Sequence, residues 1–237
     1  GIKAVGFEAI LNIVKERVQN GKFKSLTDFL NRVNPKDINK LQLEGLVKAG
    51  AFDKLNTNRQ SLFKSIPNFI TKSKYIFENK SANQIDLFGE NENQESEIVS
   101  SVEDWKFEER LSKEFEAVGF FISDHPLNQY KEVYDDYNIN DYQTFSNEDN
   151  IKDSNVAATL LKIQERKTAK GNAYAVLKLT DLTSVFELFI FSDILELNRE
   201  ILKEGDSIIL TLVKSISNEE IRFNSINVQK IASLKDL

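Results

Sequence analysis

Residues 171–193 read GNAYAVLKLTDLTSVFELFIFSD, and this stretch decides the fold of the second half of the chain. It holds two runs rich in large apolar residues, AYAVLKLT and VFELFIF, which are joined by the short polar turn DLTS. In both runs the residues alternate between two faces, as they do in strands that bury one side. We therefore expect a β-hairpin whose inner face carries Leu177, Leu179, Phe186, Leu188 and Ile190.

Three more strand-like runs flank this hairpin: NVAATLLKIQER before it, and SIILTLVKSI and IRFNSINVQKI after it. Between the third and fourth runs, SDILELNREILKEG has the spacing of an amphipathic helix and ends at Gly205. Three strands, a helix and two strands are the order of an OB-fold, a small closed barrel that often binds oligonucleotides. The sequence predicts a five-stranded OB-fold β-barrel over 151–237, and a generic small β-barrel is the alternative.

The first 78 residues repeat their apolar side chains at helical spacing. Helices are expected over 7–19, from a Ser25 cap to Pro35, over 38–48, and over 58–77, where Pro67 interrupts the pattern. The first of these places Phe7, Ile10, Leu11, Val14 and Val18 on one side, which we expect to be its apolar face. The fold class is therefore α+β, with an all-α region at 1–78 before the barrel.

Two further segments join these regions. Residues 79–104 are polar and acidic with few apolar residues, which is typical of a flexible linker. Residues 105–150 return to helical spacing, and we expect a helical connecting segment there.

Charge is distributed unevenly along the chain of 237 residues, whose formal net charge is −6. Residues 1–80 contain 15 Lys and Arg against 7 Asp and Glu. Residues 81–150 contain 4 Lys and Arg against 18 Asp and Glu, and residues 151–237 contain 12 of each charge. A basic segment attracts polyanions, and the alternative is a solvated helical surface.

Several absences narrow the function. The chain has no Cys and one His, which excludes disulfides, thiolate sites and multi-histidine metal sites. No apolar run approaches the roughly 20 residues of a membrane span, so we expect no membrane insertion. The chain opens with Gly1 and has no Met, from which we expect a segment of a longer protein.

Three long motifs resemble a known family when they are taken together and in this order. They are NKLQLEGLVKAGAFDKL at 39–55, RLSKEFEAVGFFISDHPLNQY at 110–130, and the hairpin of 171–193. From Gly1 to about Ile231 the chain resembles the C-terminal half of bacterial replicative DNA polymerase III alpha subunits.

The resemblance implies a tandem helix-hairpin-helix region, a sliding-clamp-binding segment and an OB domain of a cytoplasmic DNA-directed DNA polymerase. It implies primer-template DNA, the beta sliding clamp and other replicase subunits as partners. The catalytic domain with its Mg²⁺ would lie outside this chain, so no catalytic residue, metal or cofactor is expected within it.

The first candidate site is the opening hairpin, GIKAVG at 1–6. Here the backbone amides of Lys3, Ala4, Val5 and Gly6, helped by the Lys3 side chain, would face a duplex phosphate at a helix N-terminus. Gly6 would permit the tight backbone, whereas Ala4 departs from the Gly that such motifs often carry.

A second hairpin would use Lys48 and Gly50 in the same way. The alternative there is a helix C-cap with Phe52 buried.

The second candidate site is the peptide QIDLFG at 84–89, within the acidic stretch. It resembles the short clamp-binding peptide of polymerases, so Gln84, Asp86, Leu87 and Phe88 are the expected clamp contacts. Leu87 and Phe88 would enter apolar pockets, each contributing roughly 1.5–3 kcal/mol on full burial. The alternative is that these two side chains pack on the protein's own surface.

The third candidate site lies on the barrel. The turn after its first strand is basic, through Arg166, Lys167 and Lys170. Alternation places Tyr174, Lys178, Phe189 and Phe191 on the outer face. Aromatic rings beside cations suit the stacking of single-stranded bases. The alternative is that the aromatic rings cover the helix or the neighbouring domain, and Glu187 on the same face opposes a polyanion.

Other residues point to structure rather than chemistry. His125 follows Ser123-Asp124, where the family usually has Ser-Gly, so a conformation open only to Gly is not expected at Asp124. We expect His125 to cap or pack at a helix start, and Asp135-Asp136 to be solvated rather than a metal pair.

Two functions from other classes remain open from the sequence. One is an RNA-binding OB module with a helical appendage, as in tRNA synthetases. The other is a protein-interaction scaffold.

Overall fold

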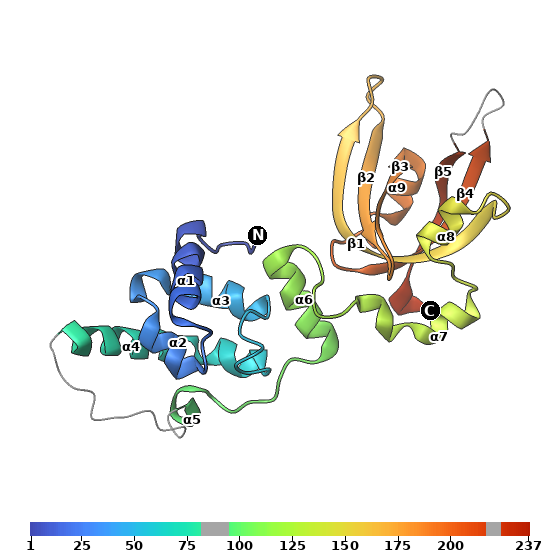
Figure 1. Cartoon of the computed structure of the whole chain (residues 1–237). Coiled ribbons are helices and arrows are strands. Elements are labelled where there is room, and N and C mark those ends of the chain that lie inside the picture. The colour runs from blue at the N-terminus through green and yellow to red at the C-terminus, as the bar shows by residue number, and fades with distance from the viewer. Residues whose placement is uncertain (82–94, 217–223) are drawn as a thin grey trace. The chain divides into compact units, whose positions relative to one another are not determined.

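The computed structural model describes residues 1–81, 95–216 and 224–237, and the chain forms two compact units, 1–123 and 124–237 (Figure 1). The division falls inside the stretch 105–150, for which the sequence predicted a single connecting segment. Each unit has a hydrophobic core of its own.

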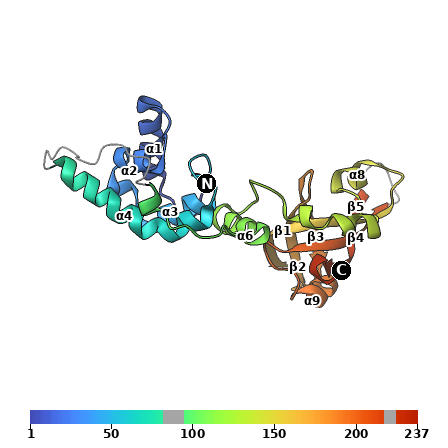
Figure 2. The ribbon, with the colours of Figure 1, turned by 90° about the horizontal axis from the view of Figure 1, so that it is seen from below.

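The first unit is helical. Its elements are α1 (Phe7–Asn20), α2 (Leu26–Arg32), the 3-10 helix η1 (Pro35–Asp37), α3 (Lys40–Lys48), α4 (Arg59–Ser81), α5 (Glu95–Ile98) and α6 (Phe107–Val118). Helix α4 is the longest, and α2 and α3 lie beside it, as Figure 2 shows. Helix α6 packs against α3. The buried core comes mainly from α2, α3, α4 and the loops between them: Leu26, Phe29, Leu30, Val33, Ile38, Leu43, Leu46, Val47, Phe52, Leu62, Ile66, Phe69 and Ile76.

The helix starts follow local capping chemistry. The Ser25 hydroxyl accepts a hydrogen bond from the Asp28 amide at 3.0 Å, which confirms the cap predicted at Ser25. The Asn39 side chain caps α3 in the same way, through the Gln42 amide at 2.9 Å. Pro67 lies inside α4, and the helix continues through it to Ser81, where the sequence predicted an interruption.

The buried face of α1 differs from the expected one. Ala9 is buried, and Ile10 and Ile13 pack against the core. Phe7 and Val18 are instead 82% and 75% exposed. The prediction was right for Ile10 and wrong for Phe7 and Val18, because the core contacts only the edge of the apolar side that carries Ala9, Ile10 and Ile13.

The described part of the acidic stretch is attached to the helices. The Glu95 carboxylate accepts a hydrogen bond from the Leu26 amide at 2.7 Å, and the Ser100 amide donates to the Ser65 hydroxyl at 2.8 Å. Ile98 and Val99 pack against the helical core. Residues 95–104 therefore belong to the first unit rather than to a linker.

The second unit is built around one antiparallel sheet. Its elements are the 3-10 helix η3 (Pro126–Gln129), α7 (Lys131–Asp136), α8 (Tyr142–Asn147), β1 (Asp153–Lys167), β2 (Ala173–Thr180), β3 (Val185–Phe191), α9 (Ser192–Asn198), β4 (Ser207–Ile216), β5 (Asn224–Ser233) and the 3-10 helix η4 (Leu234–Asp236). The strand order is β3-β2-β1-β4-β5. The long strand β1 pairs with β4 through its first half and with β2 through its second half, with a bulge between Leu160 and Lys162.

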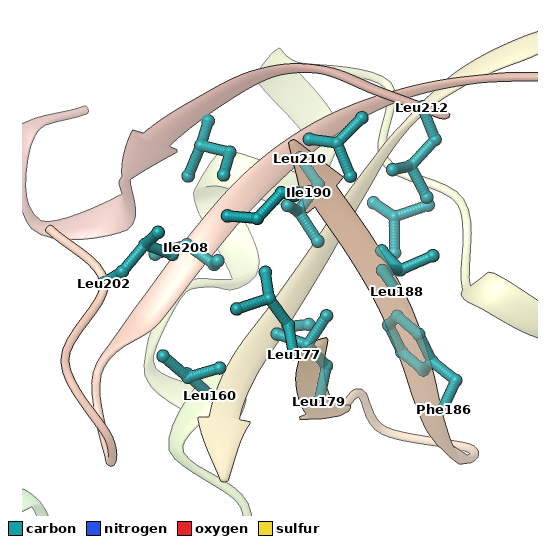
Figure 3. Packing of buried hydrophobic residues seen from close by; sticks show 14 of the residues in the cluster. Leu160, Leu177, Leu179, Phe186, Leu188, Ile190, Leu202, Ile208, Leu210 and Leu212 are labelled. Carbon is teal, nitrogen blue, oxygen red and sulfur yellow. The ribbon is translucent and has the colours of Figure 1, made fainter. Parts of the chain in front are cut away.

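The inner face of this sheet forms the second core. Figure 3 shows Leu177, Leu179, Leu188 and Ile190 pointing toward one another from neighbouring strands. Helix α9 packs against β2, β3 and β5, and its Leu195 is fully buried in this core. The inward residues predicted for the hairpin at 171–193 are therefore confirmed.

The sheet is not closed, although a closed barrel was expected. Among the described residues β3 and β5 are near one another without being hydrogen-bonded neighbours. Side chains from both strands line a groove between them. The strand order and the helix between β3 and β4 fit an OB-fold, which is often a partly open barrel.

Residues 124–150 pack on the sheet. Leu127 forms a small buried cluster with Ala157, Ile209 and Leu234. Phe145 has no exposed surface and belongs to the main core of the second unit. These residues are therefore part of the second unit rather than a connection that precedes it.

Candidate nucleic-acid interface

The opening hairpin makes its tight turn at Ala4. Its φ is +61°, in the left-handed region that favours glycine. Gly6 has φ −68° and ψ 137°, an extended conformation that any residue adopts. The conformational need assigned to Gly6 from the sequence thus falls on Ala4, two residues earlier.

A glycine of α3 lets this hairpin approach closely. A Cβ atom on Gly45 would lie 2.9 Å from Val5 Cγ2 and 3.1 Å from Ile2 Cγ2, so a side chain there would push the hairpin away. The Lys3 amide donates to the Ala117 carbonyl of α6 at 2.8 Å, which fixes the other side of the turn. The hairpin is held between two helices of the first unit, and sequence reasoning had not assigned this role to Gly45.

The hairpin amides divide into two sets. Those of Lys3 and Val5 donate within the protein, to Ala117 and Ile2. In the described part of the chain, the amides of Ala4 and Gly6 have no acceptor, and Gly6 is the N-cap of the 14-residue helix α1. The Lys3 side chain, which is exposed, has no ion pair among the described residues. Free amides at a helix N-terminus beside a cation form an arrangement that can bind a phosphate oxygen.

The second hairpin uses its polar groups internally. The Gly50 and Ala51 amides donate to the Val47 and Leu46 carbonyls at 3.0 and 2.9 Å, and Phe52 is buried. The Lys48 ammonium lies 3.1 Å from a carboxylate oxygen of Glu116. This geometry is the helix C-cap that the sequence left as the alternative for Lys48 and Gly50.

A buried ion network that the sequence did not indicate supports these helices. Arg59 is 2% exposed and binds Asp53 through two nitrogens, at 3.0 and 2.8 Å, and Glu114 at 2.8 Å. Burial alone would raise the pKa of Glu114. The hydrogen bonds from Arg59, and then from the Ser123 and Ile122 amides, hold that pKa below its ordinary value. An Arg near a helix start looks solvated in sequence, and only the fold brings it to Glu114.

The outer face of β1, β2 and β3 carries an ordered array of side chains. The strand register aligns three rows across it: Arg166–Tyr174–Phe191, Gln164–Val176–Phe189 and Lys162–Lys178–Glu187. Phe189 and Phe191 are 53% and 59% exposed, and the rings of Tyr174 and Phe191 have centroids 6.5 Å apart. Aromatic surface thus lies beside cations on one continuous face.

The predicted barrel residues come together at this face and its edge. Lys167 and Lys170 are exposed at the β1–β2 turn, which closes through Gly171 at φ +84°. Arg166, Tyr174, Lys178 and Phe189 stand on the array itself. Phe191 completes one row of the array and is as exposed as Phe189.

A groove of about 340 Å³ adjoins the array between β3 and β5. Phe189, Phe191 and Glu187 line one side, and Ser225, Ile226 and Asn227 line the other. Tyr142 contributes to the wall and stacks on Phe186 with ring centroids 3.9 Å apart. Nothing in the sequence pattern indicated this groove, because it depends on how far the sheet curls.

The remaining candidate residues have structural roles. The His125 Nδ1 accepts from the Leu127 amide at 3.1 Å, which confirms the predicted cap, and burial lowers the pKa of His125. Asp124 does not have a positive φ, as expected for a residue that replaces glycine. Asp135 and Asp136 are exposed.

In the described ranges, no cluster of three or more His, Asp or Glu side chains could hold a metal ion, and no helix is long and apolar enough to cross a bilayer. The predicted clamp residues Gln84, Asp86, Leu87 and Phe88 lie outside the described residues.

Comparison with known proteins agrees with this layout. A family model described as a helix-hairpin-helix motif matches residues 1–62, which include both hairpins. DNA polymerase III subunit alpha of Rickettsia conorii is 38% identical over 209 residues, or 86% of this chain. That of Borreliella burgdorferi is 30% identical over all of it, and that of Campylobacter jejuni is 32% identical over 86%. This chain is homologous to one segment of the DNA polymerase III alpha subunit. It spans only 17–21% of the length of these alpha subunits.

Proposed function

We propose that this chain is the DNA- and clamp-binding segment of the alpha subunit of a bacterial replicative DNA polymerase. In this role it would keep the polymerase on its template during processive synthesis, and nucleotidyl transfer with Mg²⁺ would belong to the rest of the parent chain. The observation that carries the proposal is the homology of at least 86% of the chain to alpha subunits, in the three relatives described above. The helix-hairpin-helix match over residues 1–62 supports a DNA contact in the first unit.

Duplex DNA would bind at the start of α1. The free amides of Ala4 and Gly6 would donate to one phosphate, and Lys3 would add its charge. Contacts of this kind position the protein on the duplex without reading its sequence. The second hairpin contributes less to this proposal, since its amides and Lys48 already have partners.

The duplex contact can be tested by removing one amide. Proline fits the φ of −68° at Gly6 and lacks an N–H, so Gly6→Pro should weaken duplex binding by about tenfold. Gly6→Ala keeps the amide and is the matched control, because a Cβ there meets only the end of the Gln42 side chain at 3.4 Å. Equal duplex affinity of the two variants, measured by fluorescence anisotropy at fixed salt, would refute this contact.

Single-stranded template would bind across the outer face of β1, β2 and β3. The exposed rings of Phe189 and Phe191 and the partly buried ring of Tyr174 offer stacking surfaces, and the cations of Arg166 and Lys178 lie beside them. Lys167 and Lys170 would contact the backbone at the edge of this face. The residues 151–237 carry no net charge, so we expect this binding to be weak and sensitive to salt.

Truncation of the aromatic rings tests the single-strand contact. Stacking contributes about 1–3 kcal/mol per base, so Phe189→Ala or Tyr174→Ala should weaken single-strand binding by at least about fivefold. Leu197→Ala, at an exposed side chain on α9, should leave it unchanged. An affinity for oligonucleotides that is the same in all three variants would contradict stacking on this face.

The clamp contact would be made by Gln84, Asp86, Leu87 and Phe88, a proposal that rests on the peptide sequence alone. A single peptide of this size would bind at about micromolar strength, and tethering to DNA-binding units would raise the effective affinity. The triple variant Gln84→Ala, Leu87→Ala, Phe88→Ala should lose binding to the sliding clamp, whereas Ile85→Ala should keep most of it. Equal binding by the triple variant and the unmodified chain would place the clamp contact elsewhere.

A further inference from the structure

We propose that the groove between β3 and β5 binds one unstacked base of a single strand, and that Glu187 makes this position favour cytosine over thymine. The inference rests on the proposed single-strand function and adds a base preference to it. The groove, the exposed rings beside it and an acidic side chain that has no partner among the described residues carry it.

The groove lies where a strand leaving the aromatic array would arrive. Phe189 and Phe191 belong to the array and also line the groove. A base stacked on one of these rings is therefore adjacent to a cavity of about 340 Å³ that is open beside it. A continuous path from stacking surface to cavity suits a chain of bases, one of which turns inward.

Glu187 is the unexpected residue on this path. Its register partner on β2 is Lys178, yet in the described part of the chain the Glu187 carboxylate has no ion pair or hydrogen bond. A free carboxylate facing a phosphate would repel it. The same carboxylate facing the edge of a base can accept a hydrogen bond, and cytosine offers its N4 amino group for this contact. Thymine presents the O4 acceptor at that position and would be disfavoured.

The opposite wall of the groove offers hydrogen-bonding groups to the edge of a base. Ser225 and Asn227 of β5 add polar groups across from the rings. The Asn227 side chain donates to the Ser215 hydroxyl at 3.0 Å, which leaves its amide oxygen as an acceptor in the groove wall. Apolar faces on one side with polar groups around the rim match a flat heterocycle with hydrogen-bonding edges.

An extended peptide added to the edge of β3 or β5 is the competing occupant. Main-chain pairing would account for the open sheet edges, but it gives no role to the cations on the array or to the outward rings of Phe189 and Phe191. The array and groove together favour the base.

The test compares oligo-dC with oligo-dT of equal length, bound to the whole chain at fixed low salt and pH 8. We expect the unmodified chain to favour dC by about fivefold or more. Glu187→Gln should reduce this ratio to near one, mainly by raising the affinity for dT, because its amide can donate to the thymine oxygen. Glu200→Gln, at an exposed acidic residue in the turn after α9, changes net charge equally and should leave the ratio unchanged.

The outcomes separate the two proposals. If neither oligonucleotide binds the unmodified chain, the single-strand function fails and the base preference fails with it. If both bind with equal affinity, or if the ratio survives in Glu187→Gln, single-strand binding stands and the role of Glu187 is overturned. A ratio that falls equally in Glu200→Gln would also overturn it, since the effect would then be one of net charge.

Discussion

Arg59 is the residue on which the geometry of the first unit depends most. Its guanidinium group is enclosed by Asp53 from the loop after α3 and by Glu114 from α6. Gly50 makes room for it, since a Cβ atom there would lie 2.2 Å from Arg59 Nη2. The Glu114 carboxylate in turn accepts hydrogen bonds from the amides of Ile122 and Ser123. One buried cation thereby fixes the position of α6, and α6 holds the opening hairpin through Ala117.

Removal of one partner of this network should therefore be costly. Glu114→Gln leaves Arg59 buried with less compensating charge, and we expect the free energy of unfolding of the first unit to fall by about 3 kcal/mol. Trp105, the only tryptophan in the chain, is buried in this unit, so its fluorescence in a urea titration reports the loss. Glu116→Gln removes an exposed partner of Lys48 and should cost less than about 1 kcal/mol. Equal losses in the two variants would show that burial of the pair does not matter.

The same carboxylate predicts a dependence on pH. The pKa of Glu114 in the folded state lies below its ordinary value of 4.5, so its contribution to stability is complete above about pH 4.5 and is lost as the pH falls through the lower folded value. Urea midpoints from Trp105 fluorescence should therefore drop below pH 4.5. In Glu114→Gln this part of the decline should be absent. A decline of the same size in both proteins would assign the acid sensitivity to other carboxylates.

At the scale of the element, helix α1 has two apolar sides, and only one of them meets the core. Ala9, Ile10 and Ile13 face inward, while Phe7, Leu11 and Val18 face solvent in the first unit. Ile13→Ala should lower the stability of the first unit by about 1–2 kcal/mol, because its side chain is partly buried. Leu11→Ala, the matched truncation on the other side, should change it by less than about 0.5 kcal/mol. The two urea midpoints would be reversed if the sequence-based assignment of this face were right.

The buried faces of alternating strands could be predicted from the sequence. The faces of helices and loops that pack against distant elements of the chain could not. Alternation fixed the inward side of β2 and β3, because a residue such as Leu177 can only face one of two directions. Helix α1 carries apolar residues on two sides, so spacing alone did not select the side that meets the core. The sequence of 95–104 is typical of a linker because it has few apolar residues. Ile98 and Val99 pack against the helical core, and this contact is seen only in the folded structure.

At the scale of the whole molecule, the sequence indicated the two regions proposed to bind DNA but not the boundary between the units. The outer face of β1, β2 and β3 was predictable because alternation decides which side chains face outward, and six of the nine positions of the array had been considered in advance. The groove beside it, the network of Arg59 and the close approach at Gly45 all depend on contacts between residues far apart in sequence. The boundary at Ser123 depends on such contacts as well, because the helices of 124–150 are short and their sequences do not indicate which unit they pack against.

That boundary leads to a prediction about fragments. Residues 124–150 supply Leu127 and Phe145, which are 1% and 0% exposed in the second unit, and the Lys214 ammonium lies 4.8 Å from the centre of the Phe145 ring. A fragment of residues 124–237 keeps these contacts, whereas one of residues 151–237 loses both side chains, each contributing about 1.5–3 kcal/mol when buried. The loss of about 3–6 kcal/mol approaches the whole stability of a small domain, so the shorter fragment should melt far below the longer one or remain unfolded. Circular dichroism melting curves compare them directly. Equal midpoints would mean that the sheet folds without residues 124–150 and that the sequence-based boundary at 151 describes the autonomous unit.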